Sequence, residues 1–413
     1  MTQTDPPART ARPDGDPAGR SRGTLVAEPC RVLTAPVPEA LDAPDAWALH
    51  GVVAVARASD AETYGHDDFA VTARSLWVRV RDQEDDRRAL LVALAPSGGA
   101  TADDATAAAE PGTGVPGAAT AADVLGYASV VLPRRSNTHL AHLAVVVRPD
   151  ARGRGIGATL LRAAEARAAA EGRTTTILSS EHAGEPPADA RGVLEPPSGA
   201  GRIARAAPGA ALCLRHGYAL EQASRYSVLE LPVDGDLLAR LRDEAAVRAG
   251  TDYRLLSWQD RTPEERLDAL ALLETRMSTD EPLGGLDVQE DPWDAARVRR
   301  REAQIAAAGH GYLLVAAEHV PTGALAGFTM VRYERDRPAP VFQEDTIVLR
   351  EHRGRRLGML MKADLLQRLA TVRPGARRVH TWNAEENAFM LGINVALGFR
   401  PAGVEGEWQK RLG

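Results

Sequence analysis

Short apolar runs with period-two alternation, typical of strands, occur along this chain in turn with longer amphipathic stretches, typical of helices. In the first half the pattern predicts strands at 124–132, 140–147 and 174–179. A helix at 152–170 is predicted between the last two strands. We therefore expect the first half to be an α/β domain.

The second half has more elements, in an order that defines its sheet. Strands are predicted at 253–258, 312–318, 324–332, 341–349 and 377–382, and as a terminal pair near Phe399 and Trp408. Helices are predicted at 235–249, 263–277, 293–308, 353–372 and 384–397. This order indicates a mixed sheet, because two helices are followed by a hairpin meander, a helix after a glycine-rich turn and a βαβ ending. The predicted class is α/β with α+β character.

One local pattern occurs twice, at 152–157 (Arg-Gly-Arg-Gly-Ile-Gly) and at 353–358 (Arg-Gly-Arg-Arg-Leu-Gly). Each copy follows an apolar strand and opens an amphipathic helix. Glycines permit close backbone approach, and the N–H groups and dipole at a helix start favour an anion, so each turn is suited to a diphosphate. The spacing of 201 residues (353 minus 152) predicts two similar halves.

Composition shifts divide the chain further. Two stretches rich in small and polar residues lack the periodic apolar positions that would bury them, so we expect exposed loops there. The predicted organisation is a disordered tail at 1–23, a first domain at 24–232 with insertions near 96–122 and 181–209, a linker helix at 233–250, and a second domain at 251–413.

Charge and cysteine content exclude several classes. The formal net charge of -6 argues against a nucleic-acid-binding protein. The two cysteines, Cys30 and Cys213, are too few for a disulfide framework and have no metal-ligand spacing, so we expect a reducing cytoplasm and no metal site. Since no signal peptide or membrane span is visible, we expect a soluble cytoplasmic protein.

The repeated turn fits neither common nucleotide-binding fingerprint. A Walker A loop needs Gly-Lys-Ser/Thr after its glycines, and a Rossmann turn needs two residues between its second and third glycines. The pattern Arg-x-x-Gly-x-Gly after a strand ending in Val-x-Pro (Val147, Pro149) instead resembles the acyl-CoA-binding turn of GNAT-family N-acetyltransferases. The first copy matches fully, whereas the second has Arg356 in place of the family's usual middle glycine. The order of elements resembles two tandem GNAT domains over nearly the full chain.

This resemblance implies that acetyl-CoA is a co-substrate and that its pantetheine arm inserts between splayed fourth and fifth strands, bonding to the backbone. In the second half a later helix with Asn-rich start and a Gly-Phe pair also resembles the family. The cofactor-binding residues it implies are Val348, Arg353, Gly354, Arg356, Leu357, Gly358, Asn383 and Asn387, and in the first half Val147, Arg152, Gly153, Gly155, Ile156 and Gly157.

The reaction that the resemblance implies is direct acetyl transfer to a primary amine in a ternary complex. Because alkyl amines are mostly protonated at neutral pH, a base is needed. Period-two alternation puts Glu344 on the face of Thr346 and Val348 with Asp345 opposite, so Glu344 is the first candidate. A β-bulge at the splay would reverse that phase and bring in Asp345 instead.

Other positions indicate which half is catalytic. Where many GNAT enzymes carry a proton-donating Tyr, this chain has Cys213 and Asn394, and Cys213 is more typical of a small core residue. In the first half, His139 and His142 lie near the cofactor strand. Period-two alternation, however, puts His142 on the face opposite to Val145 and Val147. We therefore predict catalysis in the second half, with the first binding acetyl-CoA or serving as a structural partner.

The acceptor is the least defined part of the prediction. Glu344, Asp345, Glu385 and Glu386 near the second cleft favour a cationic amine, in a small molecule or a peptide. No nucleic-acid or membrane partner is expected, and monomer and homodimer both stay open. The alternative from another class is a non-catalytic acetyl-CoA-responsive binding module, suggested by the missing tyrosines. A ligand-free scaffold is a third reading, which saturable acetyl-CoA binding would eliminate.

Overall fold

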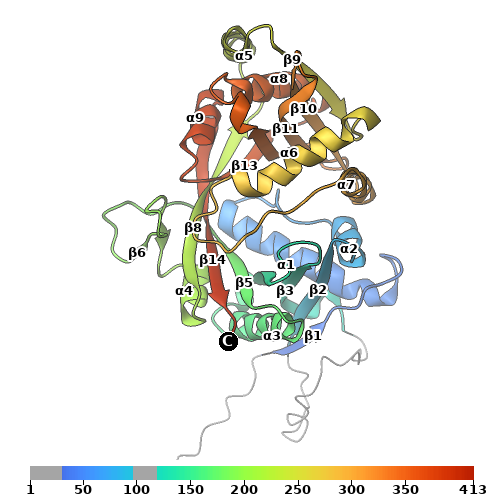
Figure 1. Cartoon of the computed structure of the whole chain (residues 1–413). Coiled ribbons are helices and arrows are strands. Elements are labelled where there is room, and N and C mark those ends of the chain that lie inside the picture. Colours follow the sequence, from blue (N-terminus) through green and yellow to red (C-terminus); the bar gives the residue numbers. More distant parts are fainter. Residues whose placement is uncertain (1–29, 96–118) are drawn as a thin grey trace, which may run out of the picture.

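A single mixed sheet runs through both halves of the protein (Figure 1). The computed structural model describes residues 30–95 and 119–413. The twelve strands of the sheet lie in the order β1-β2-β3-β4-β5-β14-β8-β13-β12-β11-β10-β9. The predicted α/β class with a mixed sheet is confirmed. No helix in these two ranges is long and apolar enough to cross a membrane.

The first half builds its sheet from β1 to β5, with two helices packed on each face. The elements are β1 (Arg31–Thr34), α1 (Trp47–Tyr64), α2 (Ala73–Arg81), β2 (Asp86–Leu94), β3 (Val124–Pro133), β4 (Leu140–Val147), α3 (Ile156–Ala170), β5 (Thr175–His182) and α4 (Pro208–Arg215). Alternation along β2 sends Leu90 and Val92 into the core under α1 and α2, and Leu91 into the core under α3. Both faces of β2 are therefore buried.

The second half repeats this plan. Its elements are α5 (Gly235–Ala249), β9 (Tyr253–Gln259), α6 (Leu267–Asp280), α7 (Ala295–Ala307), β10 (His310–His319), β11 (Ala324–Glu334), β12 (Pro340–Val348), α8 (Leu357–Val372), β13 (Arg378–Ala384) and α9 (Ala388–Leu397). Helices α6 and α7 share a core with Phe328 and Ile347 on one face of the sheet. On the opposite face, α5 and α8 share a core with Val331 and Val341.

The helices after the two glycine-rich turns begin later than predicted. Helix α3 starts at Ile156 and α8 at Leu357, four residues after the expected starts. The residues just before them, Gly155 (φ 85°) and Arg356 (φ 57°), are left-handed, which the interior of a right-handed helix cannot accommodate. Short 3-10 turns at Pro149–Ala151 and Arg350–His352 precede them.

The last strand of each half crosses into the other half. Strand β8 (Ala219–Glu230) ends the first half and pairs with β13, while β14 (Arg400–Arg411) ends the second half and pairs with β5. The two exchanged strands also pair with each other, which makes the sheet continuous. The predicted terminal pair of strands in the second half is wrong: 400–411 is one strand, and Trp408 is fully buried in the core of the first half.

The stretch at 181–209 is not simply an exposed loop. It carries a small hairpin of β6 (Val193–Leu194) and β7 (Ile203–Ala204), and Ile203 is fully buried in the first-half core. A Cβ at Gly406 of β14 would clash with the Ile203 side chain, so this segment packs directly on the exchanged strand. The predicted tail at 1–23 and most of the 96–122 insertion lie outside the described residues.

Candidate active site

Each half opens where two parallel strands part. Strands β12 and β13 pair only over 340–342 and 378–380, and beyond those residues β12 has no partner on that side among the described strands. Strands β4 and β5 pair in the same way over 140–143 and 175–178. The splay that the family resemblance implied is therefore present in both halves. A strand edge freed in this way offers backbone N–H and C=O groups to an extended ligand.

A cleft of about 810 Å³ occupies the splay of the second half. It lies between the end of β12, the glycine-rich turn and the facing sides of α8 and α9, and the end of α6 closes it on the far side. Of the predicted cofactor-binding residues, those that line this cleft are Val348, Arg353, Gly354, Arg356, Leu357, Gly358 and Asn387. Its volume falls in the range of clefts that hold cofactor-sized ligands.

The turn at the mouth of this cleft is held by Arg353. Its Nε donates to the carbonyl oxygen of Val348 at 3.0 Å, and its Nη2 lies 2.8 Å from Asp280 Oδ2 at the end of α6. Gly354 has φ 78°, as a tight turn requires. At Gly358 a Cβ would come within 3.1 Å of Ile393 Cδ1, so the glycine lets α9 approach closely. Arg356 stands in the left-handed conformation that glycine adopts more readily.

The first half repeats the same turn. Arg152 Nε donates to the carbonyl oxygen of Val147 at 3.1 Å, and its guanidinium also contacts Ser59 and Glu62 of α1. Gly153 and Gly155 have φ 76° and 85°. Gly157 faces Val147 and Leu212, each 3.6 Å from where its Cβ would be, and Ile156 is buried as the first residue of α3. The predicted duplication of the anion-binding turn therefore extends to its internal hydrogen bonds.

Strand β12 contains a bulge at the two candidate bases. Gln343 lies opposite Val331 and Thr346 opposite Thr329, so β12 has one more residue than β11 in this interval. Both Glu344 and Asp345 consequently reach Arg301 of α7, at 3.9 and 3.5 Å. The period-two prediction that placed Asp345 opposite Glu344, and Glu344 on the face of Thr346, is wrong, because the bulge considered as the alternative is present and brings both carboxylates to Arg301.

The two carboxylates have different surroundings. Glu344 Oε1 accepts from Arg332 Nε at 2.7 Å, which fixes it as part of an ion pair. Desolvation raises the pKa of Asp345; the Arg301 guanidinium opposes that rise and the charge of Glu344 adds to it. Glu281, which lines the cleft, has its pKa raised to about 7 by desolvation and by the charge of Asp345, although part of the residue is exposed. Asp345 and Glu281 therefore take up a proton more readily than ordinary carboxylates.

Two asparagines form hydrogen bonds where β13 leads into α9. Asn387 caps α9, since its Oδ1 accepts from the backbone N–H of Met390 at 3.2 Å. Asn383 Oδ1 accepts from Asn394 Nδ2 at 2.7 Å. Glu386 lines the cleft, and both its carboxylate oxygens are buried without a hydrogen-bond partner in the described structure. A ligand that brings an N–H donor or a cation would satisfy that carboxylate.

The structure shows what surrounds the three candidate positions of the first half, Cys213, His139 and His142. Cys213 is fully buried, and burial raises its pKa to about 12, so it is a core residue and not a nucleophile. His139 Nε2 lies 3.0 Å from the backbone oxygen of Asp287, in the α6–α7 loop of the second half. His142 is exposed on β4.

Sequence reasoning missed an acidic group in the first half. Strand exchange sets Glu405 of β14 directly opposite Glu181 of β5, and Glu407 follows on the same strand. Desolvation, with the charges of Glu407 and Glu181, raises the pKa of Glu405; desolvation and Glu181 raise that of Asp60 on α1 to about 7. No local pattern could have paired these residues, because β14 and β5 are more than 200 residues apart (405 minus 181 is 224).

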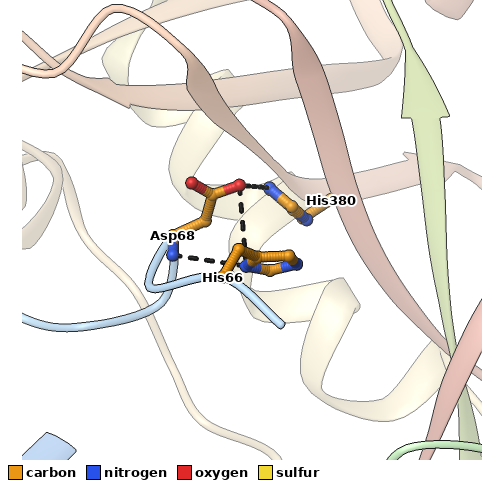
Figure 2. Close-up of side chains that lie close together, drawn as sticks. All are labelled: His66, Asp68 and His380. Carbon is orange, nitrogen blue, oxygen red and sulfur yellow. Dashed lines mark hydrogen bonds and ion pairs between the residues drawn. The ribbon is translucent and has the colours of Figure 1, made fainter. Parts of the chain in front are cut away.

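A second missed cluster joins the halves (Figure 2). His66 and Asp68, between α1 and α2, meet His380 of β13; Asp68 Oδ2 lies 3.2 Å from His380 Nε2 and 3.7 Å from His66 Nδ1. Such a set can ligate a metal, but Arg378 also contacts that oxygen, at 2.6 Å. Burial alone would raise the pKa of Asp68, yet hydrogen bonds from His380 and Arg378 outweigh it and bring the pKa to about 2. We interpret the cluster as an ion-pair hub, and the absence of a metal site stays a prediction.

Residues 82–189 match the family model for the acetyltransferase (GNAT) family. A tandem GNAT protein from the clavulanic acid biosynthesis pathway has the same fold, with 24% identity and a TM-score of 0.65. The match covers 93% of this chain and 99% of that protein. The chain thus carries a GNAT-family domain and has the fold of a tandem GNAT protein throughout, as the resemblance predicted.

Two further solved structures have related folds. A GCN5-related N-acetyltransferase from Sphaerobacter thermophilus is 14% identical, with a TM-score of 0.54 over 93% of this chain and 96% of its own. A glucosamine N-acetyltransferase region of a fungal multi-domain β-N-acetylglucosaminidase is 13% identical, with the same TM-score over 93% of this chain and 38% of that one. No curated protein matches the chain in sequence. The family match lies in the first half, whose turn has all three glycines, whereas the large cleft lies in the second.

Proposed function

We propose that the protein is an acetyl-CoA-dependent N-acetyltransferase whose chemistry takes place in the second half. One observation carries the proposal: the cleft of about 810 Å³ runs from the glycine-rich turn at Arg353 to Thr346, which ends the bulge of β12 and directly follows Asp345. A diphosphate at one end and a reacting carbonyl at the other match the two ends of this cleft. The acyl carrier supplies an activated thioester, and the protein supplies binding, orientation and proton transfer.

The cleft fits acetyl-CoA on three grounds. The start of α8 presents unpaired N–H groups at the positive end of a helix dipole, which suits a diphosphate. Arg355 and Arg356 lie at that turn. The side chain of Arg356 is more than half exposed, and its only ion pair among the described residues is with Glu244, at 3.5 Å. The free edge of β12 beyond Phe342 can bond an extended pantetheine arm.

Asp345 is the base that this environment favours. The attacking nitrogen must lose a proton, and a carboxylate with a raised pKa accepts one near neutral pH. Desolvation and the charge of Glu344 raise the pKa of Asp345, whereas Glu344 itself is engaged by Arg332. We therefore assign proton abstraction to Asp345, directly or through a water, and an electrostatic role to Glu344. Glu281 is a further acceptor for that proton.

The acceptor that suits this face of the sheet is a cationic amine. Four carboxylates gather on the side of the sheet that α6 and α7 cover, those of Glu274, Glu281, Glu344 and Asp345. Burial raises the pKa of Glu274, Glu281 and Asp345, and Glu344 lies beside Asp345 at Arg301. Arg301 and Arg332 neutralise only part of that charge. A primary ammonium entering the site would be attracted and then deprotonated. Small-molecule and peptide amines both fit this chemistry.

Acetyl-CoA titration by calorimetry tests the cofactor site. Gly358→Trp places a bulky side chain against Ile393 inside the second cleft, and Gly157→Trp is the matched variant in the first turn. We expect wild type to bind acetyl-CoA and Gly358→Trp to lose the site that supports turnover. A wild-type protein that shows no saturable binding would eliminate the proposal. Binding without transfer to any amine would favour the acetyl-CoA-responsive module.

A further inference from the structure

Helix α8 buries a cation within the core. Lys362 is 2% exposed, and it is one of only two lysines in a chain with 50 basic residues, the other being Lys410. Its Nζ donates to Asn394 Oδ1 at 2.8 Å and lies 3.7 Å from Met390 Sδ. Nζ also lies 5.7 Å from the centre of the Phe399 ring. No carboxylate of the described residues forms an ion pair with it.

A buried ammonium without a counter-ion costs several kcal/mol of desolvation, so its presence needs an explanation. Burial lowers the pKa of Lys362 to about 7. Arginine, which this chain uses at nearly every other basic position, cannot lose its proton in a protein. Lysine at this one buried site therefore supplies a group that exchanges a proton near neutral pH.

The position of Lys362 relates it to the cleft. Met390 lines the cleft from α9, and its flexible thioether lies 3.7 Å from Nζ, so Lys362 contacts a side chain of the cleft wall. Asn394, which accepts from Lys362, donates in turn to Asn383 on β13, three residues beyond the last residue of β13 that pairs with β12. The polar chain thus ends at the wall of the splay. The carboxylates Asp345 and Glu344 contact α7, on the opposite face of the sheet from α8.

We propose that Lys362 is the acid that protonates the departing sulfur of the acyl carrier, reached when the Met390 side chain turns aside. This assignment rests on the proposed function. As the neutral amine nitrogen forms its bond to the thioester carbonyl carbon, the C=O π pair moves to oxygen and a nitrogen proton passes to Asp345, which later releases it to solvent. The carbon–sulfur bond then breaks with its electron pair on sulfur, and a proton moves from Lys362 Nζ to that sulfur. Lys362 becomes neutral and regains a proton from solvent after the thiol leaves.

The pKa of the thiol of bound CoA tests the contact between Lys362 and the sulfur, and it can be measured without turnover. A cation beside the sulfur stabilises the thiolate, so the thiol pKa should fall on binding to wild type. Ultraviolet absorbance of the thiolate, followed against pH with CoA saturating, measures that pKa. We expect Lys362→Met, which keeps the side-chain length, to bind CoA but to give about tenfold less thiolate at a given pH than wild type. Lys410→Met is the matched control and should behave as wild type.

The outcomes separate the two proposals. Equal thiol pKa values in wild type and Lys362→Met, with CoA bound to both, would overturn the role of Lys362 and leave the proposed function intact. Failure of wild type to bind CoA would overturn both. If Lys362→Met does not fold, Lys362→Arg keeps the charge but cannot transfer a proton: the thiol pKa should stay low while transfer slows. A normal rate in Lys362→Arg would also overturn the assignment.

Discussion

Glu405 lies directly across from Glu181 in the sheet, although 224 residues separate them (405 minus 181). Their neighbours Trp408 and Ser180 hydrogen-bond, with Trp408 Nε1 donating to Ser180 Oγ at 2.8 Å. The chain's last strand thus completes the core of its first half. Neither half of the sheet is built from its own residues alone, because β8 makes the reverse exchange.

Trp408→Ala should therefore destabilise the first half, although the residue belongs to the last strand of the chain. Trp408 is fully buried in the core around Leu178 and Tyr218, and large-to-small changes at such sites cost about 3–5 kcal/mol. Denaturant unfolding with a probe in each half measures the loss. Val247→Ala on α5, where the side chain is 84% exposed, is the control and should change stability by less than about 0.5 kcal/mol. An unchanged midpoint for Trp408→Ala would contradict the strand exchange.

The hub at Asp68 predicts an acid-dependent stability. Its folded pKa, about 2, lies below the ordinary 3.8, so the ionised form favours the folded state. That stabilisation is complete above about pH 4 and is lost as pH falls toward 2, and it amounts to about 2 kcal/mol. Asp68→Asn should lose this amount at pH 7 and show a flatter acid decline than wild type in thermal unfolding. Asp67→Asn, at an exposed neighbour, should keep the wild-type profile.

The burial of Lys362 also predicts a stability that decreases as pH falls, but in a higher pH range. Its pKa is lowered from 10.5 to about 7, so its protonation favours the unfolded state. Its contribution is absent above about pH 10.5 and becomes increasingly destabilising as pH falls to 7, below which it is constant, at about 5 kcal/mol. Lys362→Met should be more stable than wild type at pH 6 and nearly equal at pH 10. Calorimetric melting at both pH values, with Lys410→Met alongside, checks this. A less stable Lys362→Met at pH 6 would contradict it.

Asp345→Asn and Glu344→Gln should affect the reaction differently. Removing the base should lower kcat by about 100-fold or more with acetyl-CoA affinity unchanged. Because the pKa of Asp345 is raised, kcat/KM in wild type should fall as pH drops and the carboxylate becomes protonated. Glu344→Gln loses its ion pair with Arg332, so we expect a smaller loss of rate without removal of the acid limb. If Glu344→Gln has the larger effect and abolishes the acid limb, the roles are reversed.

The sequence could predict what is decided locally. The turns at 152–157 and 353–358 need left-handed glycines and a following helix, and both requirements are visible in the residues themselves. The alternating cores on the two faces of the sheet follow from period-two patterns. These features predicted the mixed fold and seven of the residues that line the second cleft.

Other features depend on partners far away in sequence. Strand exchange places β14 beside β5 through register and packing that no local pattern encodes, and the Asp68–His380 contact joins residues 312 positions apart. The bulge at Glu344 and Asp345 changes which face each side chain takes, because one extra residue opposite β11 shifts the alternation. Burial of Lys362 arises from the packing of α9 on α8, which the helical pattern of 353–372 alone does not define.

Free-thiol release from acetyl-CoA, measured with a panel of cationic and neutral amines, tests the central claim most directly. Wild type, Gly157→Trp and Gly358→Trp should be compared under the same conditions. We predict that release requires an amine, is fastest with cationic acceptors, and disappears only in Gly358→Trp. Release that disappears only in Gly157→Trp, or no release from wild type that binds acetyl-CoA, would contradict catalysis in the second cleft.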